Sequence, residues 1–189
     1  MIVAVVACGG SDDAAGSCNA EACGGDLLGK WKVTSGCYTM IEQPELDFCP
    51  SASAAMHVDK ASGTVVFDMD TYSRDFELTE RLELSLPAKC KDQPQGKLAC
   101  ADLSADLSDG TPLICEDASG GGCSCEAIFP TKYMESGIYT KKGKQVELRN
   151  VLTDYCVNGK NLVMRPTLSM SMGMMGDMTA ILQTTLEKQ

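Results

Sequence analysis

The stretch FELTERLELSL, residues 76–86, alternates apolar and polar side chains along its length. One set of alternate positions holds Phe76, Leu78, Leu82, Leu84 and Leu86. The positions between them hold Glu77, Thr79, Arg81, Glu83 and Ser85. A period of two predicts a β-strand with one face in the core and the other in solvent. Glu80 is the exception, because it falls among the apolar positions.

Shorter segments on both sides of this stretch have the same β character. Strands are predicted over Trp31–Thr34, Thr64–Phe67, Ile138–Thr140, Val146–Leu148, Tyr155–Val157, Asn161–Met164 and Thr179–Leu186. Turns are indicated at Lys142-Gly143-Lys144 and, most strongly, at Asn158-Gly159. The only predicted helical segment is Ser51–His57, with a further turn at Asp26–Leu28. About eight strands with local turns favour an all-β, antiparallel up-and-down β-barrel, which leaves no exposed sheet edge.

Length and charge exclude several classes of protein. The 189 residues are enough for one domain with its own core. Acidic residues outnumber basic ones by 26 to 16, a formal net charge of −10. Binding to nucleic acid and electrostatic docking onto anionic lipid both need clustered basic residues, so neither is expected.

The eleven cysteines indicate an exported protein. A reducing compartment keeps thiols free unless they bind metal, and zinc ribbons use repeated CxxC knuckles. The closest pair here is Cys123-Ser124-Cys125, a CxC. Disulfides are therefore expected, and the odd total requires one cysteine with a different role.

The N-terminal residues supply that role. Val5-Val6-Ala7-Cys8 ends an apolar run and resembles the lipobox of bacterial lipoproteins, followed by Gly9 and a polar stretch. The resemblance implies a lipid on Cys8, a membrane anchor and a cell-envelope location, and Gly9 favours the outer membrane. Residues 1–7 are then a truncated signal peptide, because the run is shorter than the ~7–15 residues expected and lacks a basic n-region. The alternative is a buried first strand over Ile2–Ala7.

Beyond Cys8 the sequence divides into two parts. Residues 8–26 are small, polar and glycine-rich, which predicts a flexible tether. Residues 27–189 are predicted to form the β domain, with no cofactor motif. Cys18 and Cys23 are expected to pair with each other within the tether.

The start of the domain carries a second resemblance. Gly29-Lys30-Trp31 is similar to the G-x-W opening of lipocalins, in which the Trp closes one end of the barrel. The segments Gly120–Cys125, Gly137–Thr140 and Tyr155–Gly159 resemble Cys-rich, lipocalin-like lipoproteins of Gram-negative bacteria. The likeness covers residues 27–189 and implies a disulfide-stapled barrel, but it brings no activity. No basic residue can be assigned from sequence to stack on Trp31.

Two disulfides are predicted from proximity along the chain. Cys90 and Cys100 are expected to close a hairpin loop, and Cys115 and Cys123 to bridge the glycine-rich turn between them. The remaining cysteines are expected to join strands or the helical segment; they are Cys37, Cys49, Cys125 and Cys156.

No catalytic constellation stands out. His57 is the only histidine, and no nucleophile motif adjoins it, so it is interpreted as a surface residue and the chain is not expected to be an enzyme. The acidic residues Asp68, Asp70 and Asp75 lack the glycine and spacing of a calcium loop, as do Glu45 and Asp47. Aromatic residues make up only 5%, which counts against carbohydrate binding.

Methionines are concentrated near the C-terminus, at Met164, Met170, Met172, Met174, Met175 and Met178. Thioethers select Cu(I), so the last five of these are a candidate copper site. The alternative is a loop between the last two strands whose methionines cover the barrel mouth or an apolar ligand.

The leading functional prediction is a binding module for a small hydrophobic ligand, since an eight-stranded barrel can hold one. The alternative is a structural or interaction lipoprotein with a filled barrel. An apolar cavity above ~300 Å³ would favour binding, and a packed interior would favour display.

Overall fold

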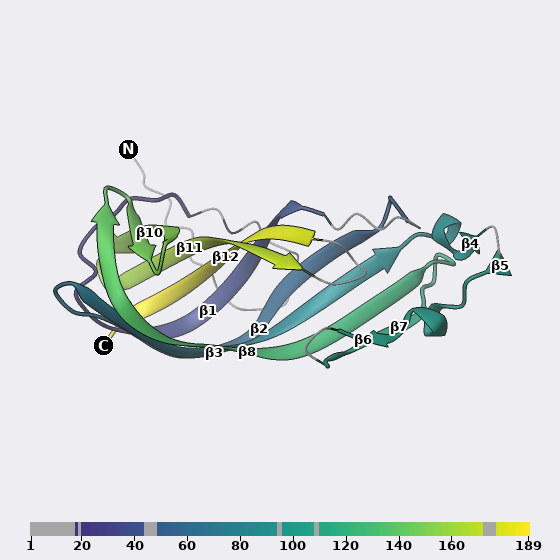
Figure 1. Cartoon of the computed structure of the whole chain (residues 1–189), viewed down its shortest axis with the longest axis horizontal. Coiled ribbons are helices and arrows are strands. Elements are labelled where there is room, and N and C mark those ends of the chain that lie inside the picture. The colour runs from purple at the N-terminus through teal and green to yellow at the C-terminus, as the bar shows by residue number, and fades with distance from the viewer. Residues whose placement is uncertain (1–17, 19, 44–48, 94–95, 108–109, 172–176) are drawn as a thin grey trace.

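Twelve β-strands and two short 3₁₀ helices make up the computed structural model, which describes residues 18, 20–43, 49–93, 96–107, 110–171 and 177–189 (Figure 1). The long strands are β1 (Gly29–Glu42), β2 (Ser53–Phe67), β3 (Thr71–Leu86), β8 (Cys123–Lys142), β10 (Val151–Asn158), β11 (Asn161–Ser171) and β12 (Asp177–Lys188). The short strands are β4 (Asp92–Gln93), β5 (Gly96–Lys97), β6 (Ala105–Asp106), β7 (Pro112–Asp117) and β9 (Gln145–Leu148). The helices are η1 (Ala88–Lys91) and η2 (Cys100–Leu103).

The chain is all-β, and ten strands form one antiparallel sheet in the order β3-β2-β1-β12-β11-β10-β9-β8-β7-β6. β3 pairs with β8 as well as with β2. When the pairings are followed from β3 through β2, β1, β12, β11, β10 and β9 to β8, they therefore lead back to β3. Neighbours differ greatly in the length of their pairing. The pairing of β2 with β3 extends from Ser53 opposite Ser85 to Phe67 opposite Tyr72. In contrast, β1 pairs with β2 only through its residues Gly29 to Lys32.

The strand predicted from residues 76–86 is confirmed and extends to Thr71. Its even-numbered side chains face the core from Tyr72 to Leu86, and Glu80 is buried among them. The hairpin predicted at Asn158-Gly159 is also present, with Gly159 and Lys160 as its two loop residues, because β10 ends at Asn158 and β11 begins at Asn161. Gly159 has a φ of 61°, which is the left-handed conformation that this turn requires.

The predicted helical segment Ser51–His57 is wrong. Residues from Ser53 onward belong to β2, and Ala54 and Met56 face Leu84 and Leu82 of β3. A long antiparallel partner outweighs the weak local preference of an alanine-rich segment for helix. At Asp26–Leu28, where a turn was predicted, the backbone has no regular turn, but the Asp26 carboxylate accepts a hydrogen bond of 3.1 Å from the Leu28 N–H.

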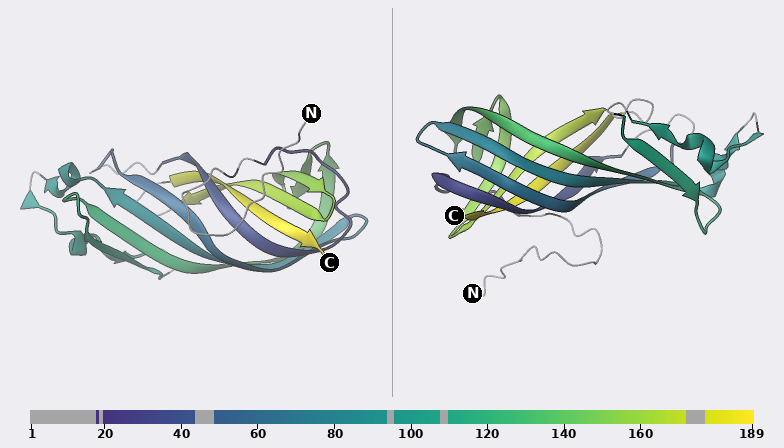
Figure 2. Two further views of the ribbon diagram at one scale, coloured as in Figure 1. Left: turned by 180° about the vertical axis from the view of Figure 1, so that it is seen from behind. Right: turned by 90° about the horizontal axis from the view of Figure 1, so that it is seen from below.

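Two apolar clusters lie at opposite ends of the long axis. The Trp31 end contains Trp31, Phe67, Tyr139, Tyr155, Leu162 and Leu186, among others, contributed by β1–β3 and β8–β12. The disulfide end contains Leu82, Leu84, Leu86, Leu113 and six cysteines, contributed mainly by β2, β3, β7, β8 and the two 3₁₀ helices. Figure 2 shows β2, β3 and β8 running between the two ends, whereas β9 to β12 are confined to one side.

Candidate functional site

A small cavity inside the Trp31 end is the main candidate site. Its volume is about 80 Å³. Most of its wall is apolar, and the polar contributors are Arg74, Tyr133, Thr153 and Thr184. The apolar contributors are Val65, Phe76, Leu148, Val151, Met164, Pro166, Leu168 and Leu182. The alternation of strands explains this wall, because every second side chain of β3, β8, β11 and β12 points inward.

Arg74 belongs to an ion-pair cluster at the cavity. It faces Glu135 across the β3–β8 pair, with Arg74 Nε 3.0 Å from Glu135 Oε1. Glu135 also accepts a hydrogen bond from the Tyr72 hydroxyl and lies 3.6 Å from Arg149 Nη1. Burial alone would raise the pKa of Glu135, but Tyr72, Arg74 and Arg149 outweigh it and lower that pKa below its ordinary value. The carboxylate is therefore held in its ionised form.

Tyr133 connects this cluster to a buried carboxyl group. Its ring lies under the Arg74 guanidinium, 5.4 Å from ring centroid to Cζ, and its hydroxyl shares a hydrogen bond with Tyr38. Tyr38 and Thr131 both donate hydrogen bonds to Glu80, which is only 2% exposed. Burial raises the pKa of Glu80 despite these two donors, and burial together with Glu80 raises the pKa of Tyr133 to about 12.

Trp31, the aromatic residue of the Gly29-Lys30-Trp31 motif, lies in the apolar cluster of the Trp31 end. It is fully buried, and its indole N–H donates a 2.7 Å hydrogen bond to the Leu27 carbonyl. Gly29, two residues earlier, has a φ of 122°. A basic partner that could not be assigned from sequence is present, because Lys188 Nζ of β12 lies 5.3 Å from the indole ring.

All ten cysteines that the structure describes form disulfides, but each pairing predicted from proximity is wrong. The bonds are Cys18–Cys37, Cys23–Cys156, Cys49–Cys90, Cys100–Cys123 and Cys115–Cys125. Sequence neighbours do not pair because the sheet brings distant segments together. Cys115 and Cys125, for example, are directly opposite each other in the β7–β8 pair.

Cys18 and residues 20–25 form a strap across the sheet rather than the end of a free tether. Its first cysteine is bonded to Cys37 of β1. Ala20 then contacts two further strands, because its N–H donates to Gln183 of β12 and its carbonyl accepts a 2.6 Å hydrogen bond from Arg165 of β11. Gln183 is 1% exposed.

The strap ends on β10. Cys23 is bonded to Cys156, and the N–H groups of Cys23 and Gly24 donate to the Tyr155 carbonyl at 3.1 and 2.9 Å. Leu27, just after the strap, is fully buried. The domain boundary predicted at residue 27 is therefore too late, and the folded domain includes Cys18 and residues 20–26.

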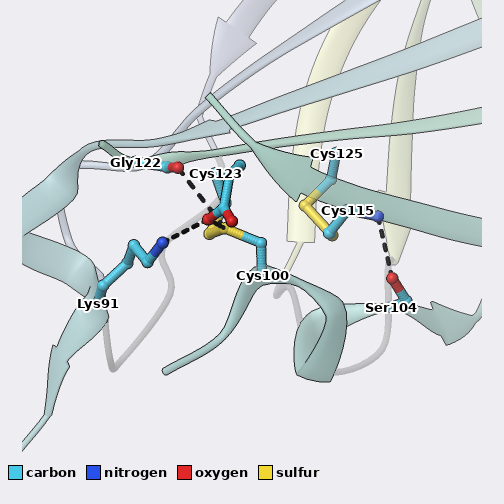
Figure 3. The surroundings of a disulfide bond; sticks show 8 residues. Lys91, Cys100, Ser104, Cys115, Gly122, Cys123 and Cys125 are labelled. Atoms are coloured by element: carbon cyan, nitrogen blue, oxygen red, sulfur yellow. Dashed lines mark hydrogen bonds and ion pairs between the residues drawn. A yellow bond between two sulfur atoms is a disulfide. The ribbon is translucent and has the colours of Figure 1, made fainter. Parts of the chain in front are cut away.

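The disulfide end owes its arrangement to the CxC motif (Figure 3). Alternation along β8 places Cys123 and Cys125 on the same inner face. There Cys123 forms a disulfide with Cys100 of η2, and Cys125 forms one with Cys115 of β7. The glycine-rich turn before β8 permits this approach. A Cβ on Gly122 would lie 2.1 Å from the Leu86 carbonyl oxygen, so only glycine fits there.

His57 is near an acidic side chain of the neighbouring strand β3. It lies on the outer face of β2, with Nε2 3.5 Å from Glu83, and its side chain is 27% exposed. Asp68 and Asp70 lie in the turn between β2 and β3, and Asp75 follows on β3. Within the described ranges, no three His, Cys, Asp or Glu side chains are close enough to hold a metal ion. Glu45 and Asp47 lie outside the described residues.

The methionines of the candidate copper site are only partly described. Met178 is buried at the disulfide end, and Met164 is buried at the Trp31 end, where it lines the cavity. These two side chains serve separate cores. Met170 belongs to β11, and Met172, Met174 and Met175 lie outside the described residues.

Sequence reasoning missed most of the cavity residues. Arg74, Tyr133 and Glu135 were not singled out, because β3 and β8 are far apart in the chain. Two signals were present. The alternation of β3 continues backward from Phe76 to Arg74 and Tyr72, and Glu80 is a carboxyl group on an apolar face.

Comparisons of the chain with protein-family models, curated proteins and solved structures find no match. Among the described residues, no helix is long and apolar enough to cross a membrane.

Proposed function

We propose that the chain is an exported lipoprotein, held to the outer membrane by a lipid on Cys8, whose β domain binds a small apolar ligand. The cysteine count supports the export and the anchor. The ten described cysteines are all paired with one another, which leaves none of them for Cys8. Five disulfides in one domain are typical of an oxidising compartment.

For the domain we propose a lipocalin-like barrel. The return of the pairing order to β3 supports a closed sheet, and buried Trp31 with Lys188 over its ring supports the likeness at one end. A closed sheet of this kind presents its inner face as a ligand site.

The observation that carries ligand binding is the apolar cavity beside Arg74. At about 80 Å³ it is well below the ~300 Å³ of common ligand pockets. An engineered apolar cavity of about 150 Å³ is known to hold benzene, so a space of this size fits a ligand of only a few carbon atoms. The ligand is thus smaller than the sequence led us to expect.

A second candidate function is display of a filled barrel on the envelope, as a structural or interaction protein. The small cavity also supports this candidate, because the space beside the apolar side chains of the Trp31 end is only about 80 Å³. Such a protein would act through its outer surface, and no small molecule would accompany it.

Native mass spectrometry of the full chain, purified from an oxidising compartment in mild detergent, tests these proposals. We expect a mass that shows five disulfides, an added lipid and a small bound metabolite. Cys8→Ala should remove the lipid and release the protein into the aqueous fraction, whereas Ser11→Ala should change neither. An unlipidated wild-type chain would contradict the anchor. A lipidated chain without any metabolite would favour display.

A further inference from the structure

We propose that the cavity binds a short aliphatic carboxylate, with its head group at Arg74 and its chain against the apolar wall. This inference rests on the proposed ligand-binding function and specifies the class of ligand. It comes from the position of Arg74, the balance of charge around it and the size of the space beside it.

Arg74 is placed to receive an anion. Its side chain lines the cavity and is 26% exposed, so its charge is partly removed from water. Its Nε–H is buried, and its partner in the described part of the chain is the Glu135 carboxylate, with Nε 3.0 Å from Oε1. A guanidinium carries five N–H donors, so Arg74 can pair with Glu135 and still offer donors to the carboxylate of a ligand in the cavity.

The charges around the cavity favour a negative ligand. Two guanidinium groups, Arg74 and Arg149, approach a single carboxylate, Glu135. A further carboxyl group, Glu80, interacts with Tyr133 and is bound by Tyr38 and Thr131. Among the described residues that line the cavity, the one charged side chain is therefore positive, in a protein whose formal net charge is −10.

Glu135 does not depend on Arg74 alone. The Tyr72 hydroxyl donates to it, and Arg149 approaches its other oxygen. If the Arg74 guanidinium turns toward a ligand, the Glu135 carboxylate keeps these two partners. After this change of partner, both Glu135 and the carboxylate of the ligand would therefore be paired.

The rest of the cavity wall determines the size and polarity of the hydrocarbon part of the ligand. Phe76, Leu148, Met164 and Leu182 contribute apolar surface, and a space of about 80 Å³ is about half the volume that holds benzene. An unbranched chain of about three or four carbons fits this space. A neutral molecule of the same size would gain the apolar contacts but not the charge-assisted hydrogen bonds to Arg74.

The test compares sodium butyrate with 1-butanol on the full-length, disulfide-intact protein. The protein carries ¹³C-methyl methionine, and the signal of Met164, assigned through Met164→Leu, reports on the cavity wall. We expect both probes to shift this signal, and butyrate to bind about tenfold more tightly or better. Arg74→Gln should abolish that advantage without affecting butanol. Arg81→Gln, on the outer face of the same strand, should change neither affinity.

The outcomes separate the inference from the function on which it rests. Equal binding of butyrate and butanol to the wild-type protein would overturn the carboxylate inference and leave apolar ligand binding in place. A Met164 signal that responds to neither probe would overturn both. The wild-type comparison decides between these outcomes even if Arg74→Gln does not fold.

Discussion

The two ends of the molecule stabilise their cores in different ways. At the Trp31 end, strands pair on both sides and large side chains such as Trp31, Phe67 and Tyr155 are almost completely buried. At the disulfide end, β2, β3 and β8 extend beyond β9 to β12, and the strands that accompany them are only two to six residues long. The buried side chains recorded there include six cysteines and no aromatic residue.

The difference shows what a sheet needs where it cannot pair on all sides. The described aromatic side chains of the disulfide end are partly buried Tyr38 and Phe129. Short segments such as η1 and η2 bury little surface of their own, and covalent bonds to Cys49 and Cys123 hold them in place. Disulfides lower the entropy of the unfolded chain, so they compensate for a core with little apolar area.

Removing the three bridges of the disulfide end should produce the largest effect. Each bridge contributes about 2–4 kcal/mol, so together they approach the total stability of about 5–15 kcal/mol of an ordinary domain. With all six cysteines changed to alanine, we expect β7 and η2 to lose their protection from amide hydrogen exchange. The amides of β1 and β12 should remain protected. Exchange followed by mass spectrometry measures both regions in one experiment.

The matched control is removal of Cys23 and Cys156, which should loosen the strap and leave β7 protected. Simultaneous loss of protection in β1 and β7 in the six-alanine variant would show that the two ends unfold as one unit. In that case the comparison between two separately stabilised cores would be wrong.

Trp31→Ala should have the next largest effect. The side chain is fully buried, and its indole N–H bonds to the Leu27 carbonyl. Truncation of a buried Trp costs about 3–5 kcal/mol of unfolding free energy. Urea unfolding followed by circular dichroism measures this loss. Ile138→Ala, at a side chain that is 73% exposed, should change stability by less than about 0.5 kcal/mol. A small loss in Trp31→Ala would mean that the Trp31 end does not depend on its largest side chain.

Gly122→Ala should destabilise the disulfide end to a smaller extent. The added methyl group would lie 2.1 Å from the Leu86 carbonyl oxygen, and overpacking of this kind costs about 1–3 kcal/mol. Gly120 is the matched control, because a Cβ there meets no atom within 4 Å. The same urea titration compares the two variants. Equal stability of both would show that β8 and Leu86 can separate without loss.

The parts of the fold that were predicted correctly depend on neighbouring residues. The alternation of residues 76–86 and the Asn158-Gly159 turn are local patterns, and both are present in the structure. The segment Ser51–His57 was misinterpreted because its strand partner, around Leu82 and Leu84, comes about thirty residues later. A local pattern cannot contain that information.

The same reason explains the disulfides and the cavity. Their number follows from counting cysteines, but Cys23 pairs with Cys156 across 133 residues, and no spacing rule predicts such a bond. Arg74 and Glu135 meet only because β3 and β8 pair. Glu80 could be detected from the sequence because a charged residue interrupts an apolar face. Its partners Tyr38 and Thr131 could not be detected, because they lie on other strands.

The smallest expected effect concerns two carboxyl groups on the inner face, Glu80 and Glu135, whose stability contributions should change with pH in opposite directions. Burial raises the pKa of Glu80 above its ordinary value of 4.5 in the folded protein. The unfolded chain then loses this proton first as the pH rises past 4.5, so the stability of the wild type falls between 4.5 and the folded pKa. Glu80→Gln removes that loss, and its stability relative to the wild type should therefore increase with pH over this window.

For Glu135 the sign is reversed. Its pKa is lowered from 4.5, chiefly by Tyr72 and Arg74 against the effect of burial, so its contribution is present above 4.5 and is lost as the pH falls through the folded pKa. Glu135→Gln should therefore be most destabilising near neutral pH and least destabilising near pH 3. Urea unfolding of the wild type and both variants from pH 3 to 8 tests the two slopes together. Parallel curves for the two variants would show that Glu80 and Glu135 experience the same environment, which the buried hydroxyl partners of one and the arginines of the other argue against.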